Sequence, residues 1–133
     1  MASIFAKIIS GEIPSYKIAE SASCYAFLDI SPLAKGHTLV VPKIETDYIF
    51  DIDDAGHAEL WQFAKKVAVS VKAAVPCKRI GIAVIGLEVP HAHIHLIPMN
   101  RVSDMNFAMP KLTFSKEEME TVAAEMRKHI NFR

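Results

Sequence analysis

The sequence feature that most constrains this chain is the alternation of histidine and apolar residues from His91 to Ile97. On a β-strand successive side chains point to opposite faces, so the three histidines share one face while Ala92, Ile94 and Leu96 share the other. A buried row of imidazoles would leave every ring nitrogen in need of a partner, which is costly in an apolar core unless water or a ligand supplies it. The run therefore predicts a strand whose histidine face lines a cleft.

Three chemical roles are open to such a face, because an imidazole with an ordinary pKa of about 6.5 can bind a metal, exchange protons or attack an electrophile. Same-face neighbours on a strand lie about 6.6 Å apart. A zinc ion needs its ligand nitrogens at about 2.0 to 2.1 Å, so two of these histidines can converge on one ion and the third only with distortion. We therefore favour acid–base or nucleophilic chemistry, expect no metal, and keep a zinc site as the less favoured alternative.

The remaining pattern predicts an α+β fold with a five-stranded antiparallel sheet. Apolar residues at three- and four-residue steps predict a long amphipathic helix from Asp54 to Val75. A capping box formed by Ser115 and Glu118 begins a last helix. The short connections between the strands favour antiparallel pairing. A short helix is expected at residues 3–10, and strands are expected at residues 16–20, 24–29, 37–41, 78–85 and 91–97.

The composition narrows the partners and the location. A chain of 133 residues fits one domain, here taken as residues 1–133, and its formal net charge is zero. Without an excess of basic residues, the sequence does not predict the positively charged surface that binds a long nucleic acid or an anionic membrane. Cys24 and Cys77 lack the Cys-x-x-Cys spacing of zinc and redox motifs. Lys7 interrupts the first apolar stretch and no segment has the length of a membrane span, so we expect a cytoplasmic protein that acts on small ligands or protein partners.

The histidine run resembles, almost letter for letter, the motif of the histidine-triad (HIT) superfamily. Residues 4–9, 12–14, 26–32 and 36–43 are similar to signature segments of its Hint-like branch, so the resemblance extends over about residues 3–98. It implies a HIT-like fold, in which one long helix and a C-terminal helix cover the five-stranded sheet. It also implies a homodimer, in which the long helix and the strand at residues 78–85 join across a two-fold axis to make one ten-stranded sheet.

What the resemblance implies for the histidines is nucleotidyl transfer through a covalent intermediate. His93 would attack the α-phosphorus of a nucleoside phosphoramidate or a dinucleoside polyphosphate, and water would then release the mononucleotide. A main-chain carbonyl near His91 would orient His93. His95 would give hydrogen bonds to the phosphoryl oxygens and a proton to the leaving group. His37, from the neighbouring strand, would be a further phosphate contact.

The resemblance also implies a purine nucleotide site. It assigns Asp29 to the ribose hydroxyls, although the sequence alone is equally compatible with a turn residue that bonds its own backbone. No cofactor is implied, and Ser3 and Ala6 stand where some bacterial relatives carry the cysteines of a structural zinc site. Core packing is the competing explanation for the residues assigned to the apolar base pocket, which are Phe27, Ile30, Ile8 and Ile13.

The loop before the histidines departs from the family pattern. Many relatives carry a glutamine and a hydroxyl residue there that assist the leaving group, whereas this chain has Leu87 and Glu88. A like charge about 4 Å from the phosphates would cost up to about 4 kcal/mol at an effective dielectric constant of about 20. We therefore expect Glu88 to turn outward or to pair with Arg101. The missing pair leaves the leaving group open, and it keeps a second function in view, that of a nucleotide-binding regulatory protein with weak catalysis.

Overall fold

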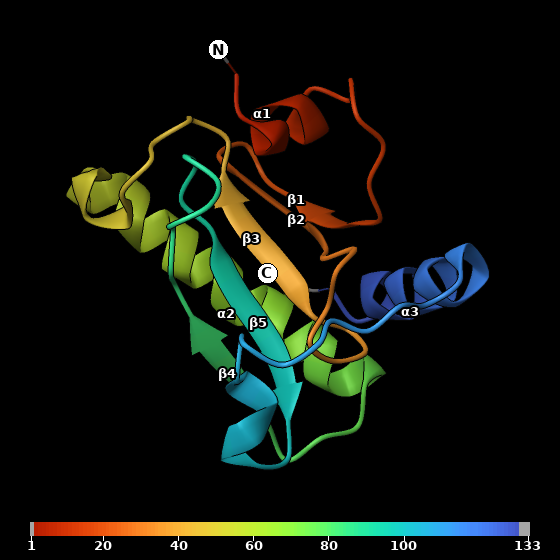
Figure 1. Ribbon diagram of the computed structural model, residues 1–133. Helices are drawn as coiled ribbons and strands as arrows, with labels where there is room; N and C mark the ends of the chain where they lie inside the picture. The colour runs from red at the N-terminus through yellow and green to blue at the C-terminus, as the bar shows by residue number, and fades with distance from the viewer. Residues whose placement is uncertain (1, 131–133) are drawn as a thin grey trace.

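The computed structural model describes residues 2–130 and contains a five-stranded antiparallel sheet with the strand order β1-β2-β3-β5-β4 (Figure 1). The predicted sheet, long helix and C-terminal helix are therefore confirmed. The strands are β1 (Lys17–Glu20), β2 (Cys24–Leu28), β3 (Thr38–Pro42), β4 (Arg79–Ala83) and β5 (Ile94–Met99). The helices are α1 (Ile4–Ile9), α2 (Asp54–Ala74) and α3 (Lys116–Lys128), with two short 3-10 helices, η1 (Ile49–Asp51) and η2 (Val102–Met105).

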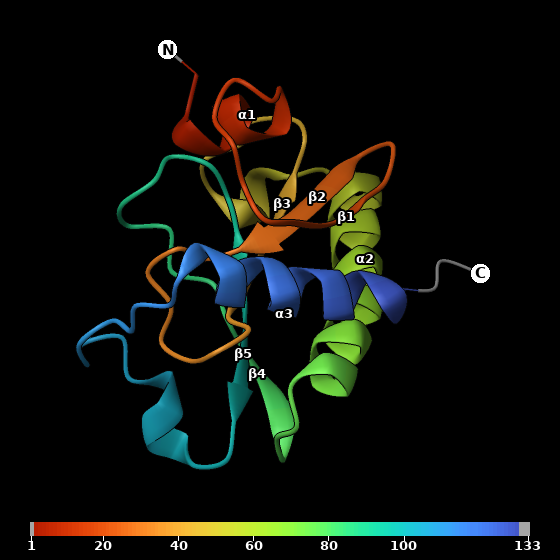
Figure 2. The same cartoon turned by 90° about the vertical axis from the view of Figure 1, so that its right-hand side faces the viewer.

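Strands β2 and β3 are buried on both faces, which explains their nearly continuous apolar sequence. On one face, Ala26 and Leu28 belong to the main core beneath α2 and α3. On the other face, Phe27 and Leu39 pack with α1 in a second apolar cluster. Leu39 is the register partner of His95, so the histidines lie on the face that α1 partly covers. Figure 2 shows α2 on one side of β4 and β5 and η2 on the other.

Each of the two predicted amphipathic helices begins at a side chain that caps it, and for α3 this is the expected capping box. Asp53 accepts a hydrogen bond from the N–H of Gly56 at 2.9 Å and so caps α2. Ser115 and Glu118 form the predicted capping box of α3. No helix within residues 2–130 combines the length and the apolar character that a bilayer crossing needs. The inward stripe of α2 is fully or almost fully buried and comprises Leu60, Phe63, Ala64, Val67 and Val71.

The last strand is shorter than the alternation predicted. We expected residues 91–97, whereas β5 begins at Ile94. The observed register would place Ala92 opposite Pro42, and a proline has no N–H to donate to the ladder. The N–H of Ala92 instead donates to the main-chain oxygen of Thr46 at 2.7 Å. His91 and His93 therefore lie in the irregular segment that leads into β5, and only His95 lies on the strand itself.

Candidate active site

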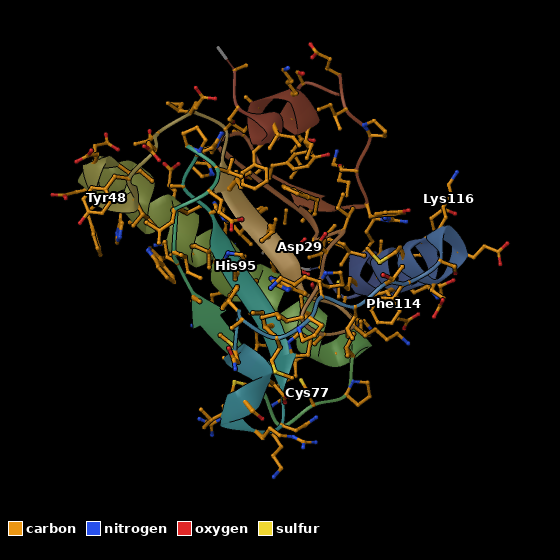
Figure 3. All side chains as sticks on the ribbon, in the orientation of Figure 1. Asp29, Tyr48, Cys77, His95, Phe114 and Lys116 are labelled. Atoms are coloured by element: carbon orange, nitrogen blue, oxygen red, sulfur yellow. The ribbon has the colours of Figure 1, made fainter. Side chains whose placement is uncertain are left out.

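A cavity of about 400 Å³ opens on the histidine face of the sheet. Its wall includes His37, His93, His95 and Asp29, four of the residues that the sequence singled out. Figure 3 shows Asp29 and His95 side by side near the centre of the molecule. Ligand sites of this kind span roughly 300 to 1,000 Å³ and combine apolar walls with a few converging polar groups. The cavity therefore has the size and the lining of a small-molecule site.

His93 is held by one ring nitrogen while the other stays open. Its Nδ1 lies 2.8 Å from the main-chain oxygen of His91, and because a carbonyl oxygen can only accept, Nδ1 carries the proton. Nε2 therefore keeps its lone pair. Phe5 packs edge-on against the ring, with 4.9 Å between the centroids. Burial lowers the pKa of His93, although the bond to His91 and the charge of Asp29 act in the opposite direction, so the neutral ring is favoured at neutral pH.

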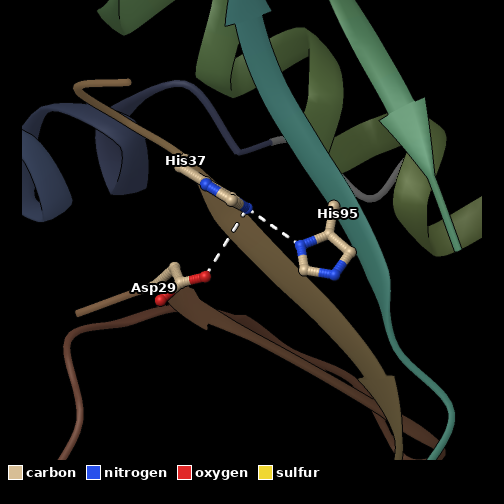
Figure 4. Close-up of side chains that lie close together, drawn as sticks. All are labelled: Asp29, His37 and His95. Carbon is tan, nitrogen blue, oxygen red and sulfur yellow. Dashed lines mark hydrogen bonds and ion pairs between the residues drawn. The ribbon is translucent and has the colours of Figure 1, made fainter. Parts of the chain in front are cut away.

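His37 and His95 form a hydrogen-bonded pair whose direction is set by the backbone (Figure 4). The N–H of Leu33 donates to Nδ1 of His37 at 3.0 Å, so a neutral His37 carries its proton on Nε2. That Nε2 donates to Nδ1 of His95 at 2.9 Å, which leaves the proton of His95 on its Nε2. Burial lowers the pKa of His37 to about 3 and that of His95 to about 4, so both rings are neutral at pH 7.

The hydrogen bonds of His37 do not fit its expected role as a phosphate contact. Both of its ring nitrogens bond to groups of the protein, one to the backbone of Leu33 and the other to His95. A direct contact from this ring to a phosphate would have to break one of these bonds. The structure therefore places His37 behind His95, where it positions that ring and fixes which nitrogen carries the proton.

The open nitrogens of His93 and His95 lie near one another on the same cavity. The two ring centroids are 4.9 Å apart. Among residues 2–130 neither Nε2 has a hydrogen-bond partner, and no buried side-chain nitrogen or oxygen of these residues is left without one, so both atoms are accessible from the cavity. An electrophile bound here would meet a lone pair from His93 and an N–H donor from His95.

The His91 ring is a structural element rather than part of the cavity wall. It is 0% exposed, and its Nε2 donates to the main-chain oxygen of Pro42 at 2.8 Å. Its Nδ1 accepts from the hydroxyl of Ser3, also at 2.8 Å, and the same Ser3 oxygen caps α1 by accepting from the N–H of Ala6. His91 thus joins α1 to the end of β3, and its main-chain oxygen holds His93.

Asp29 combines the two roles that the sequence left open. Its Oδ1 accepts from the N–H of Ser31 at 2.8 Å, which is the expected turn bond. Its Oδ2 lies 3.6 Å from Nε2 of His37 and the side chain borders the cavity. Burial raises the pKa of Asp29, against the opposing effects of the Ser31 bond and of two nearby groups, His93 and Lys111.

The ligand atoms of Asp29, His37 and His95 lie within 4.8 Å of one another, close enough to consider a metal site (Figure 4). A metal on Nε2 of His37 would move the ring proton to Nδ1, where it would face the N–H of Leu33, and two donors would then oppose each other. The donor set fits a proton-sharing pair better than a set of metal ligands. A zinc ion held by all three triad histidines does not fit, because both nitrogens of His91 are bonded elsewhere.

The residues assigned to the base pocket do not line this cavity. Phe27 and Ile8 are buried in the apolar cluster under α1, and Ile13 packs against the edge of that cluster. Ile30 is 75% exposed. Core packing therefore accounts for the first three. Phe27 lies on the same face of the sheet as His95, but the apolar cluster under α1 covers it. The apolar wall of the cavity consists instead of Ile4, Phe5, Leu39, Ile85, Leu87, Val89 and Phe107.

Three wall residues were missed or misplaced by sequence reasoning. Phe107 and Lys111 come from the segment between η2 and α3, which has no periodic pattern or motif that could have indicated them. Glu88 lies on the cavity wall. Burial lowers the pKa of His93, and the negative charge of Glu88 is one of the smaller effects that oppose this lowering. Two alternatives were expected for Glu88, and Glu88 is exposed, as the outward alternative requires. The alternative pairing with Arg101 is wrong, since Arg101 lies 3.9 Å from Asp104 and, within residues 2–130, forms no ion pair with Glu88.

Comparisons with known proteins agree with this geometry. The family model described as HIT domain matches residues 10–102. The adenosine 5'-monophosphoramidase of Schizosaccharomyces pombe is 34% identical over 133 residues, covering 98% of this chain and 99% of the relative. A HIT-like protein of Bartonella henselae, whose structure holds an unknown ligand, superposes with a TM-score of 0.84 at 32% identity, covering 96% of each chain.

A second solved structure is similar over nearly the whole chain. It is a histidine triad family protein of Mycobacterium smegmatis that is described as zinc-bound, and it superposes with a TM-score of 0.80 at 25% identity over 96% of this chain and 95% of that one.

Four observations lead to one family assignment. They are the sheet order, the paired histidines on one cavity, the family model and the relatives at more than 30% identity. This chain belongs to the HIT family.

Proposed function

We propose that this chain is a nucleotide hydrolase that cleaves a purine nucleoside phosphoramidate at its α-phosphate through a covalent His93-nucleotidyl intermediate. The observation that carries the proposal is the lone pair on Nε2 of His93 next to the N–H on Nε2 of His95. Family membership supports nucleotide hydrolysis, and the name of the Schizosaccharomyces pombe relative supports a phosphoramidate as the substrate class.

In the first step, Nε2 of His93 bonds to the α-phosphorus, and the bond from phosphorus to the amine breaks with its electron pair moving to nitrogen. The positive charge that develops on the imidazole is stabilised by the Nδ1–H bond to the carbonyl of His91. The N–H of His95 donates to a phosphoryl oxygen. Water then attacks the phosphorus and frees His93. The departing amine takes a proton from solvent as the phosphorus–nitrogen bond breaks. The hydroxyl of the attacking water later remains on the mononucleotide, and its other proton returns to solvent, so the protons balance.

We assign His95 the role of a hydrogen-bond donor rather than of a proton donor. Loss of its Nε2 proton would require a second proton to reach Nδ1 from His37. Burial lowers the pKa of both rings so far that each is neutral at pH 7 and carries a single ring proton. Neither ring therefore carries an extra proton that it could give to the leaving group. On the nucleoside side, we assign Oδ2 of Asp29 to the ribose hydroxyls and the wall at Ile4 and Phe5 to the base, because all three residues border the cavity.

The proposed reaction is tested by trapping the intermediate. Wild-type protein is mixed with an adenosine phosphoramidate in the presence of a chelator, quenched within the first turnovers, and analysed by peptide mass spectrometry. We expect an AMP adduct on the peptide that contains His93. Nucleotide binding without adduct or turnover would support the regulatory alternative, and turnover that requires metal would support zinc at Asp29, His37 and His95.

Glu88 predicts a preference for an amine over a phosphate as leaving group. Its carboxylate on the cavity wall repels further negative charge, and two unit charges about 4 Å apart in water repel by about 1 kcal/mol. For Glu88→Gln we therefore expect kcat/KM for a dinucleoside polyphosphate to rise about fivefold relative to that for a phosphoramidate. Parallel assays with both substrates measure the ratio, and Glu117→Gln on α3 is the matched control. An unchanged ratio would remove Glu88 from the selection of the leaving group.

The acidic limb of the pH profile provides another test. Protonation of Nε2 removes the nucleophile, and burial lowers the pKa of His93, so the neutral ring persists to lower pH than it would in water. We expect kcat/KM to fall with decreasing pH along a limb whose apparent pKa lies below about 6.5, the ordinary value of histidine. Initial rates from pH 4 to 8 measure the limb. A midpoint above the ordinary value would contradict a neutral, desolvated His93.

We also propose that two copies of the chain associate through β4 and α2. β4 is an edge strand, so one row of its backbone N–H and C=O groups is unpaired within the described sheet. Ile82 and Val69 expose 53% and 63% of their surface on these elements. Antiparallel pairing of β4 with its copy would extend the sheet to ten strands. We expect sedimentation equilibrium to give a dimer and Val69→Glu to give a monomer; a monomeric wild type would refute the association.

A further inference from the structure

The segment at residues 106–112 contributes Phe107 and Lys111 to the cavity wall and is fixed near both of its ends. Near one end, the ring of Phe107 packs edge-on against His95 with 4.9 Å between centroids, and against His37 with 6.4 Å. At the other end, the N–H of Leu112 donates to the main-chain oxygen of Pro32 at 2.8 Å. In Figure 2 the chain between η2 and α3 runs on the side of the sheet opposite α2. Lys111 is therefore held beside the cavity rather than on a distant surface.

Lys111 is the one lysine or arginine among the described residues of the cavity wall. Its Nζ donates to the main-chain oxygen of Phe107 at 2.7 Å and lies 5.8 Å from the centroid of that ring. An ammonium group has three donors, so two stay available for another acceptor. Within residues 2–130 no carboxylate lies within ion-pair distance of this nitrogen, and its charge is unmatched by a direct partner.

The charge of Lys111 acts directly on the catalytic groups. After burial and the neighbouring rings, it is a further influence that lowers the pKa of His37 and of His95, and it opposes the burial that raises the pKa of Asp29. These three side chains belong to the wall of the cavity in which we place the α-phosphate. The histidines there are neutral and can offer hydrogen bonds but no full positive charge, whereas the phosphate of the substrate is an anion.

We propose that Lys111 is a substrate-binding residue that neutralises the α-phosphate, and that the 106–112 segment positions it. This assignment rests on the proposed function, because it takes the ligand to be a nucleotide whose phosphate lies between His93 and His95. The charge of Lys111 acts on Asp29, His37 and His95, the polar wall of the cavity, so we place it against the phosphate of the bound nucleotide. Its contribution therefore belongs to any ligand with a 5'-phosphate and is absent from the corresponding nucleoside.

The experiment compares the binding of AMP and of adenosine by calorimetry, without any turnover. The variants are Lys111→Gln, which removes the charge, Lys111→Arg, which retains it, and Lys116→Gln as a control. Lys116 begins α3, and 80% of its side chain is exposed. A charge-assisted hydrogen bond is worth more than a neutral one, so we expect Lys111→Gln to weaken AMP binding about tenfold. Adenosine binding should change less than about twofold, and Lys111→Arg should stay within about threefold of the wild type.

The outcomes separate this assignment from the proposed function. Equal affinity of wild type and Lys111→Gln for AMP would overturn the role of Lys111 while leaving the His93 chemistry intact. Equal losses for AMP and adenosine would overturn it too, because they would indicate a structural effect of the substitution. If the wild type bound neither ligand, the proposed function would fail and this assignment would fail with it. A selective loss for AMP that also diminishes at high salt would establish the charge contact.

Discussion

Replacement of His93 by alanine should reduce the release of AMP from an adenosine phosphoramidate by at least about 10³-fold, the scale expected when a covalent nucleophile is removed. His93 carries the only lone pair that the described histidines of the cavity direct into it, since His37 is bonded at both ring nitrogens and His95 presents an N–H. Initial rates with chelator present, at equal protein concentrations, measure the loss.

The same variant should remain folded and should still bind AMP. His93 makes one side-chain hydrogen bond, to the backbone of His91, and its other nitrogen faces the cavity. His129→Ala is the matched control, because His129 ends α3, contacts Glu125 and does not border the cavity. Retention of more than about a tenth of the wild-type rate by His93→Ala would exclude the covalent mechanism, which cannot proceed without this imidazole.

Replacement of His91 by alanine should have its effect on stability instead. The ring is fully buried, and its loss leaves the carbonyl of Pro42 and the hydroxyl of Ser3 without the partner that each now has. An unsatisfied buried group costs about 1–3 kcal/mol, and the cavity left by the ring adds to that. We expect the free energy of unfolding to fall by about 3–5 kcal/mol, which is a large fraction of the stability of a small domain.

Urea unfolding of wild type, His91→Ala and His93→Ala would measure this difference. The midpoint of His91→Ala should shift far more than that of His93→Ala, although the two residues are two positions apart in one motif. His91→Asn would retain a donor and an acceptor and should recover part of the loss. Equal shifts for His91→Ala and His93→Ala would contradict the division of the motif into a structural ring and a chemical ring.

Much of the fold could be predicted because its signals are local and periodic. The stripe of α2 and the capping box of α3 follow from side-chain spacing within one helix, and the structure has both. The histidine alternation correctly gave His93 and His95 a common side. It failed at the start of β5 because that boundary depends on Pro42, a residue of another strand that ends the ladder for want of an N–H.

The parts of the site that could not be predicted depend on tertiary packing. The resemblance assigned Phe27 to the base pocket. The strand register does put this ring on the same face as His95, but the packing of α1 covers it. Lys111 reaches the cavity only because Leu112 bonds to Pro32, a contact between residues 80 positions apart for which a non-periodic segment gives no sign. The alternation also could not distinguish His91 from His93, because their roles differ in hydrogen-bond partners and not in residue type.

The hydrogen bonds from Leu33 to His37 and from His37 to His95 begin at a main-chain amide, which can donate but never accept. The backbone amide of Leu33 therefore fixes which ring nitrogen carries the proton in His37 and, through His37, in His95. A small rotation of the backbone at residues 32–33 would alter the donor strength of the Nε2–H of His95, two hydrogen bonds away. The Pro32 carbonyl also receives the Leu112 N–H, so the loop that orients the His95 proton and the segment that carries Lys111 share one anchor. Whatever displaces that anchor changes the hydrogen-bond donor and the cation of the cavity together.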